Sequence, residues 1–163
     1  MFAVDQARVT GTLLALFLAK SGFSDNRAVS IVGYSLGSVV AFNCLKMLKR
    51  LHDFKTEKAA IVINDIQFWA GAYVLNLNKQ YQEVLDRAAY CLVCNGHLNN
   101  LFSSKDYALK YGFPMIFRGQ TAVGLYPIFE DIKEEDRDAV KLADNYNVTK
   151  EAPGHSTYGP NCG

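Results

Sequence analysis

The sequence predicts an α/β fold in which a mostly parallel sheet is flanked by helices. Two observations lead to this prediction. Short apolar segments rich in β-branched residues alternate along the chain with longer segments whose apolar residues recur at helical spacing. The strand-like segments are apolar throughout, which is typical of parallel strands buried on both faces. Because the chain has 163 residues, half of them hydrophobic, we expect residues 1–163 to form a single domain with one core.

The first third of the chain predicts a helix, a strand and a second helix. From Asp5 to Ala19 the apolar residues have mainly helical spacing, and Ser21-Gly22 then supplies a stop signal. The segment Ala28–Tyr34 is short and β-branched, which indicates a buried strand. From Val39 to Leu51 the apolar residues follow a period of about 3.6 residues, with basic residues on the opposite side, which predicts an amphipathic helix.

The rest of the chain continues this alternation, with weaker patterns toward its end. The expected elements are a strand at Ala59–Asp65, a helix at Asn76–Arg87, a strand at Ala88–Asn95, a loop between Gly96 and Ser103, a short helix at Asp106–Tyr111, a charged helix at Glu130–Asp144, a weak strand at Tyr146–Thr149 and a final loop. The stretch from Gly112 to Pro127 is rich in glycine and aromatic residues and gives no periodic signal.

Composition and charge exclude several classes of protein. The net charge of +1 is spread without a block of like charges, so no nucleic-acid-binding surface is expected. The glycine-rich patterns that let a backbone approach a phosphate are missing, which argues against nucleotide binding, and no cofactor is expected. The longest apolar stretch, Thr12–Ala19, is far short of the roughly 20 residues that cross a bilayer. It also lacks the flanks of a signal peptide, so no transmembrane segment is expected.

The four cysteines favour buried free thiols over a redox or metal site. Cys91 and Cys94 lie in an apolar run that reads as a buried strand, whereas a redox pair at this spacing normally opens a helix. No second pair at this spacing and no suitably spaced histidine supports zinc, so no metal is expected. Free thiols at these positions and at Cys44 and Cys162 favour a reducing, intracellular compartment.

The sequence Gly-Tyr-Ser-Leu-Gly at residues 33–37 matches the G-x-S-x-G pattern of a nucleophile elbow. In such an elbow a serine stands on a tight turn between a strand and a helix, and the flanking glycines leave room for the turn to pack. The expected strand before Ser35 and helix after it supply that context. The Leu36 amide would then face a developing oxyanion. The alternative is that Ser35 is only a small residue or a helix cap at a strand–helix junction.

A serine nucleophile needs a base, and the base needs a carboxylate to orient it. In this architecture the acid follows a later strand and the histidine lies in a late loop, an order that Asp106 and His155 fit. Asp106 could instead only cap its helix, and Asp65 competes for the role of the acid. Of the other histidines, His52 is explained by its place at a helix end, and His97 by a turn after Asn-Gly, from which it could still approach the site.

Several blocks of sequence resemble a known family. The segments VSIVGYSLGSVVAFNCL, NGHLNNLFSSKDYAL, FRGQTAVGLYPI and NVTKEAPGHSTY occur in the same order in the lipase-like α/β-hydrolase family of transmembrane and coiled-coil domain-containing proteins. The resemblance covers most of residues 27–158, and the blocks at Gly124–Ile128 and Gly154–Tyr158 are its more specific parts. It implies an α/β-hydrolase fold with Ser35 as nucleophile, Asp106 as acid and His155 as base, and an ester or lipid-like substrate.

The sequence departs from the family's pattern before the elbow, because only one helix precedes the elbow strand. The resemblance therefore implies a partial α/β-hydrolase fold that lacks the N-terminal half-sheet and the loop that gives a second oxyanion amide. We expect Ala28–Tyr34 to be an apolar sheet edge, which proteins normally cover. Upstream residues of a longer chain, a partner chain or a second copy could cover it and complete a serine hydrolase. The alternative is a non-catalytic, hydrolase-like structural subunit of a larger assembly.

Overall fold

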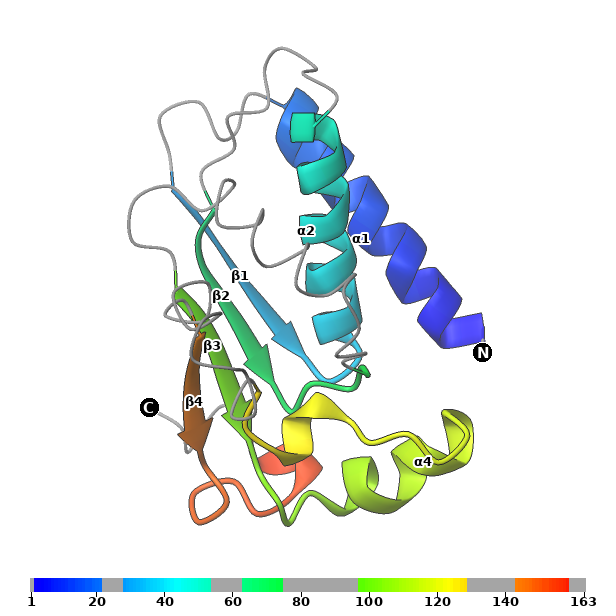
Figure 1. Ribbon diagram of the computed structural model, residues 1–163, viewed down its shortest axis with the longest axis vertical. Coiled ribbons are helices and arrows are strands. Elements are labelled where there is room, and N and C mark those ends of the chain that lie inside the picture. The colour runs from blue at the N-terminus through cyan, green and yellow to red at the C-terminus, as the bar shows by residue number, and fades with distance from the viewer. Residues whose placement is uncertain (1, 22–27, 54–62, 75–96, 129–142, 159–163) are drawn as a thin grey trace, which may run out of the picture.

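A computed structural model describes residues 2–21, 28–53, 63–74, 97–128 and 143–158. Its centre is a four-stranded sheet in the order β1-β2-β3-β4, and every neighbouring pair is parallel (Figure 1). The strands are β1 (Val29–Tyr34), β2 (Ile63–Trp69), β3 (His97–Phe102) and β4 (Ala143–Asn147). The predicted α/β class with a parallel sheet is therefore confirmed, and the arrangement is consistent with a partial α/β fold.

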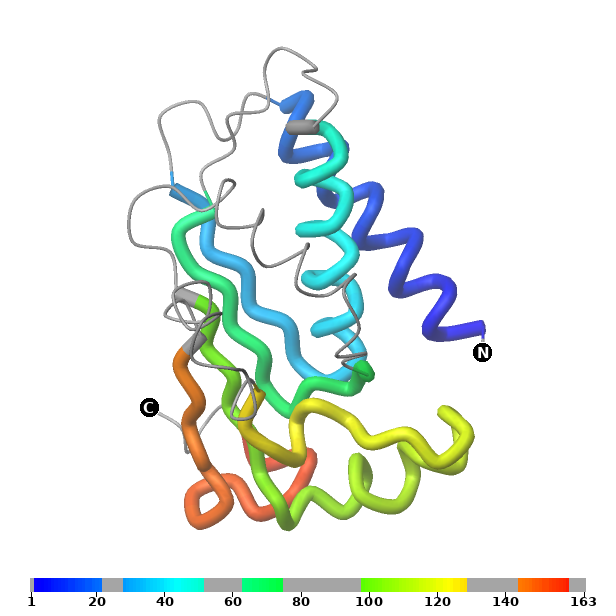
Figure 2. The backbone as a smooth tube through the Cα atoms, viewed as in Figure 1, coloured from blue at the N-terminus to red at the C-terminus, as the bar shows by residue number. Residues whose placement is uncertain are grey.

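Two long helices pack beside the sheet. Helix α2 (Gly37–Asp53) lies against the sheet, and α1 (Phe2–Lys20) packs on the outer side of α2 (Figures 1 and 2). Both helices were predicted, and so was the strand between them. The prediction that this strand is buried was wrong, because only Gly33 of β1 is buried and its other residues are exposed or partly buried. Short helical segments gather at the carboxyl ends of the strands, at the lower end of Figure 1. They are η1 (Ala108–Gly112), α4 (Phe113–Ile116), η2 (Val123–Leu125) and η4 (His155–Thr157).

Small residues allow α1 and α2 to approach each other closely. Ala7, Gly11 and Ala15 recur every fourth residue on the buried side of α1. A Cβ atom on Gly11 would lie 2.3 Å from the carbonyl oxygen of Val40 in α2, so only glycine fits at this crossing. By length and composition alone, α1 would also suffice to cross a membrane, a property that it shares with core helices and signal sequences. The expectation that the chain has no transmembrane segment stays a prediction.

The core lies between the sheet and α2. Ile63, Ile66 and Phe68 of β2 are almost completely buried, because they project toward the helix that connects β1 to β2. Cys44 of α2 belongs to the same cluster, and burial raises the pKa of its thiol to about 12. Cys44 is thus a buried free thiol, as predicted. Cys91, Cys94 and Cys162 lie outside the described residues.

The prediction for the second strand was wrong at its end. It placed the end of the strand at Asp65, whereas β2 continues to Trp69. The polar pair Asn64-Asp65 resembles a strand end in the sequence. In the fold, the Asp65 carboxylate accepts hydrogen bonds from Ser30 Oγ, at 3.4 Å, and from Asn64 Nδ2, at 2.5 Å. These partners allow polar residues inside the strand.

The predicted loop between Gly96 and Ser103 is also wrong, because residues 97–102 form β3. Its polar Asn99-Asn100 pair reads as a loop in the sequence. Asn100 is nevertheless fully buried, and its amide nitrogen donates to the Tyr126 carbonyl at 3.1 Å and to Asn145 Oδ1 at 3.2 Å. A buried polar side chain with such partners fits in a central strand.

The remaining differences concern the edges of elements. Strand β4 begins at Ala143, before the predicted Tyr146, so the predicted charged helix cannot reach Asp144. The helix expected at 106–111 is present as η1, and α4 continues it. The helix at 76–87, the strand at 88–95 and most of the helix at 130–144 were predicted for segments outside the described residues.

Candidate active site

Ser35 stands on a tight turn between the end of β1 and the start of α2. Its φ of 51° is in the left-handed region, which non-glycine residues rarely adopt. The turn is held from the neighbouring strand, because the Ser35 amide donates to the Trp69 carbonyl at 2.8 Å. The Ser35 carbonyl accepts from the amides of Ala72 and Ser38, each at 3.1 Å. A strained serine whose backbone is fixed by three hydrogen bonds is the arrangement expected of an elbow.

The two glycines of the motif have different roles. A Cβ atom on Gly33 would lie 2.7 Å from Ser38 Cα and 2.8 Å from the Gly37 carbonyl oxygen, so the turn requires glycine there. A Cβ atom on Gly37 would meet nothing within 4 Å. The interpretation that both glycines make room for the turn is thus confirmed for Gly33 and wrong for Gly37.

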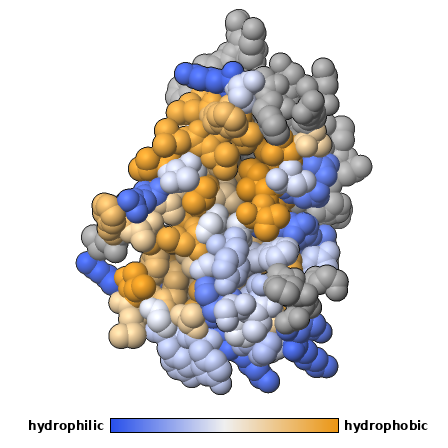
Figure 3. Space-filling view, turned by 180° about the vertical axis from the view of Figure 1, so that it is seen from behind, coloured by the Kyte–Doolittle hydropathy of each residue, from blue (hydrophilic) through white to orange (hydrophobic). Residues whose placement is uncertain are grey.

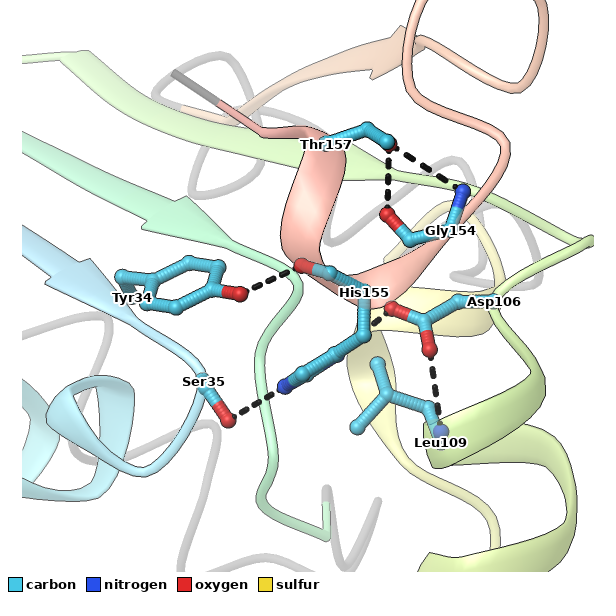
Figure 4. A network of polar contacts seen from close by, with 7 residues as sticks. All are labelled: Tyr34, Ser35, Asp106, Leu109, Gly154, His155 and Thr157. Atoms are coloured by element: carbon cyan, nitrogen blue, oxygen red, sulfur yellow. Dashed lines mark hydrogen bonds and ion pairs between the residues drawn. The ribbon is translucent and has the colours of Figure 1, made fainter.

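The structure brings the three predicted side chains together in a chain of hydrogen bonds (Figure 4). His155 Nε2 lies 2.7 Å from Ser35 Oγ, and His155 Nδ1 lies 2.7 Å from Asp106 Oδ2. The Asp106 side chain is fully buried and that of His155 is 25% exposed. Ser35 follows β1, Asp106 follows β3 and His155 follows β4, so parallel strands deliver all three to one edge of the sheet.

Asp106 also caps the helical segment that follows it. Its Oδ1 accepts a hydrogen bond from the Leu109 amide at 3.0 Å, while Oδ2 faces His155. The two alternatives weighed for Asp106, helix cap and partner of the histidine, are therefore both present in one side chain. Asp65, the competing acid, has its carboxylate engaged within the sheet by Ser30 and Asn64.

The loop that carries His155 is fixed by its own hydrogen bonds. Thr157 Oγ1 accepts from the Gly154 amide at 3.1 Å and donates to the Gly154 carbonyl at 2.6 Å. These contacts hold the start of η4, where His155 is the first residue. These hydrogen bonds fix the backbone of the loop and thereby help to fix the position of the His155 imidazole.

Tyr34, the residue before the serine, makes a contact that the sequence did not predict. Its hydroxyl donates to the backbone carbonyl of His155, and the two rings lie 5.4 Å apart between centroids (Figure 4). Burial, followed by the charge of Asp106, raises the pKa of the Tyr34 hydroxyl, which favours its hydrogen-bond-donating form. The only available signal was the position of Tyr34 inside the motif, and a motif does not specify which loop will meet it.

The Leu36 amide follows Ser35 directly and donates to no acceptor among the described residues. Its role in an oxyanion hole stays a prediction. Of the other histidines, His97 is the first residue of β3, so its predicted place in a turn was wrong. His52 lies in the last turn of α2, as expected. The described residues hold no cluster of three or more side chains suited to a metal ion.

The chain belongs to DUF726, a family of proteins of unknown function, whose model matches residues 1–162. It is 28% identical over 156 residues to the transmembrane and coiled-coil domain-containing protein STS1 of Oryza sativa subsp. japonica, an alignment that covers 96% of this chain and 20% of STS1. This name agrees with the family resemblance found in the sequence. A second relative is the one whose name includes the term lipase.

That relative is the probable lipase MIL1 of Saccharomyces cerevisiae, which is 28% identical over 156 residues, or 96% of this chain and 12% of MIL1. An uncharacterized membrane protein of Caenorhabditis elegans is 26% identical over 155 residues, or 95% of this chain and 22% of its own length. The chain thus spans less than a quarter of the length of these relatives. No solved structure matches it significantly.

Proposed function

We propose that this chain carries the catalytic centre of a serine ester hydrolase, with Ser35 as nucleophile, His155 as base and Asp106 as acid. The observation that carries the proposal is the pair of 2.7 Å contacts that His155 makes, one through each ring nitrogen. The strained backbone of Ser35 supports it, because an elbow exposes the hydroxyl to a substrate.

The geometry defines the movement of protons. With a proton on Nδ1 facing Asp106, Nε2 is free to accept the Ser35 proton as Oγ attacks the carbonyl carbon of an ester. The resulting oxyanion accepts a hydrogen bond from the Leu36 amide. When the intermediate collapses, Nε2 returns the proton to the leaving alcohol and the acyl group stays on Oγ. Water, deprotonated by His155, then attacks the acyl carbon. The bond between this carbon and Oγ breaks, Nε2 returns the proton to Oγ, and the carboxylic acid leaves.

The proposed substrate is an ester of lipid-like character, which the name of the yeast relative, a probable lipase, supports. Only the Leu36 amide is proposed from the described residues as an oxyanion donor, and loss of a second donor costs about 10² to 10³ in rate. We therefore propose that a longer polypeptide or a partner supplies the second donor. The same element, or a second copy of the chain, would cover the edge of β1.

A second function is favoured by the position of β1 at one end of the sheet, with β2 as its one neighbour among the described strands. A strand in this position can pair with another chain. The chain would then be a non-catalytic structural subunit whose hydrolase-like residues no longer react.

Labelling with a fluorophosphonate probe, followed by peptide mapping, separates the two functions. The hydrolase predicts a covalent adduct on Ser35 that disappears in Ser35→Ala and falls strongly in His155→Ala. Ser30→Ala is a matched control, because Ser30 lies on the same strand and is exposed, and this variant should keep the adduct. A silent Ser35 in a folded complex, in which the edge of β1 is covered, would contradict the enzyme and support the subunit.

A further inference from the structure

An outward-facing apolar surface lies on the segment that begins directly after Asp106. It consists of Tyr107, Tyr111, Met115 and Ile116, whose exposed fractions run from 57 to 86%, and we call it the 107–116 surface. Isolated exposed apolar residues are ordinary on a protein. Four large ones within a single short segment form a patch, and a patch of this kind indicates a binding surface.

The exposure of these side chains is fixed by the packing underneath. On the inner side of the same segment, Leu109 and Phe113 are buried in a small hydrophobic cluster. Outside, the Tyr107 and Tyr111 rings stack with centroids 5.8 Å apart and an angle of 13° between their planes. Met115 follows four residues later, so the outer side chains share one face. The segment is therefore amphipathic, with its apolar outer face held away from the core.

Basic residues lie within and on both sides of the 107–116 segment in the sequence. Lys105, Lys110 and Arg118 are exposed, and none of them makes an ion pair with a carboxylate among the described residues. Lys110 Nζ lies 5.8 Å from the centroid of the Tyr111 ring, so the charge sits directly beside the apolar patch. Between residues 103 and 128 the one acidic residue is Asp106, which is fully buried. The surface thus combines apolar anchors with positive charge that no exposed acid within residues 103–128 offsets.

We propose that the 107–116 surface binds the face of a lipid bilayer that carries anionic headgroups. Apolar side chains on one face with basic residues beside them are the features of a helix that lies in a membrane interface. Tyrosine is enriched at headgroup level, and basic residues are attracted to anionic lipids. A second copy is a poorer occupant, because a two-fold contact through this patch would bring like charges together.

The position of this surface gives the binding a consequence. Helix α4 lies at the same end of the molecule as η4 and the carboxyl end of β1 (Figure 1). Seen from behind, apolar surface follows α1 and reappears lower down in the region of α4 (Figure 3). Docking through the 107–116 surface would hold the carboxyl edge of the sheet near the bilayer. The proposal concerns membrane binding alone and does not depend on whether Ser35 reacts.

Sedimentation with lipid vesicles tests the proposal on the full chain. Vesicles of phosphatidylcholine mixed with phosphatidylserine should bind at least tenfold more protein than vesicles of phosphatidylcholine alone, and added salt should weaken the binding. Met115→Ala/Ile116→Ala should reduce binding to the anionic vesicles about tenfold or more, because both side chains would leave the bilayer. Lys110→Gln/Arg118→Gln should weaken binding to the anionic vesicles roughly fivefold for each charge removed.

The matched control is Leu13→Ala/Phe17→Ala, which removes a similar apolar area from the exposed side of α1 and should keep the binding. Equal binding to neutral and anionic vesicles, no binding at all, or an equal loss in this control would overturn the proposal. So would self-association of the free protein that Met115→Ala/Ile116→Ala abolishes, because a second copy would then occupy the surface. All four substituted apolar side chains are more than half exposed, so folding should not change, and circular dichroism checks this.

Discussion

At the scale of single residues, the turn at Ser35 depends on one glycine. A methyl group on Gly33 would meet backbone atoms of Gly37 and Ser38, which cannot move aside without opening the turn, whereas a methyl group on Gly37 meets open space. Gly33→Ala should therefore lower the free energy of unfolding by about 1–3 kcal/mol and abolish labelling of Ser35. Gly37→Ala should change the free energy of unfolding by less than about 1 kcal/mol. Chemical denaturation measures both, and equal effects of the two would contradict this account.

Tyr34 is a positioning residue in the proposed enzyme, because it acts through the backbone of His155. Tyr34→Phe keeps the ring and removes the hydroxyl, so the loop loses one hydrogen bond, worth about 0.5–1.5 kcal/mol. We expect labelling of Ser35 by a fluorophosphonate to slow by about two- to tenfold, from the same range. Tyr111→Phe, on an exposed tyrosine, is the control and should leave the rate unchanged. An unchanged rate in Tyr34→Phe would show that the contact does not position the histidine.

At the scale of elements, the contact between α1 and α2 rests on Gly11. Its hydrogen faces the Val40 carbonyl so closely that a methyl group would force the helices apart. We expect Gly11→Ala to destabilise the protein by about 1–3 kcal/mol, although alanine has the better helix propensity. Gly112→Ala tests propensity alone, because Gly112 has helical dihedral angles and open space around it, and it should be neutral or stabilising by up to about 1 kcal/mol. Thermal unfolding of both variants gives the comparison.

The sequence predicted the two long helices and the existence of β1, but not the burial of β1. Helices α1 and α2 follow from apolar periodicity, and the order of Ser35, Asp106 and His155 follows from the places where strands end. Strand β1 follows from its β-branched residues, yet Gly33 is its one buried residue. Strand β3 was missed because Asn100 is polar and buried, and its partners come from distant segments around Tyr126 and Asn145. The Tyr34 contact was missed for the same reason, since it depends on how η4 folds back over β1.

At the scale of the whole molecule, β1 stands at one end of the sheet that the described strands form, and this position predicts association when no partner covers it. Val32 lies on β1 and is 53% exposed. Val32→Lys places a charge beside the edge and should shift the chain toward monomer in sedimentation velocity experiments. Tyr146→Lys is the matched control, because the exposed Tyr146 lies on β4 at the opposite end of the sheet. This variant should leave the association state unchanged. A monomer at all concentrations, or equal effects of the two variants, would contradict association through β1.

The hydroxyl of Tyr34 links this edge to the chemistry proposed for the site. Strand β1 leads directly into Ser35, and its last residue, Tyr34, donates a hydrogen bond to the backbone of His155. It is also the strand with which a neighbouring chain would pair. Any added strand that twists or shifts β1 must therefore move Ser35 and His155 together. Pairing of another chain with β1 and the reactivity of Ser35 would then be coupled, because both depend on the position of this strand.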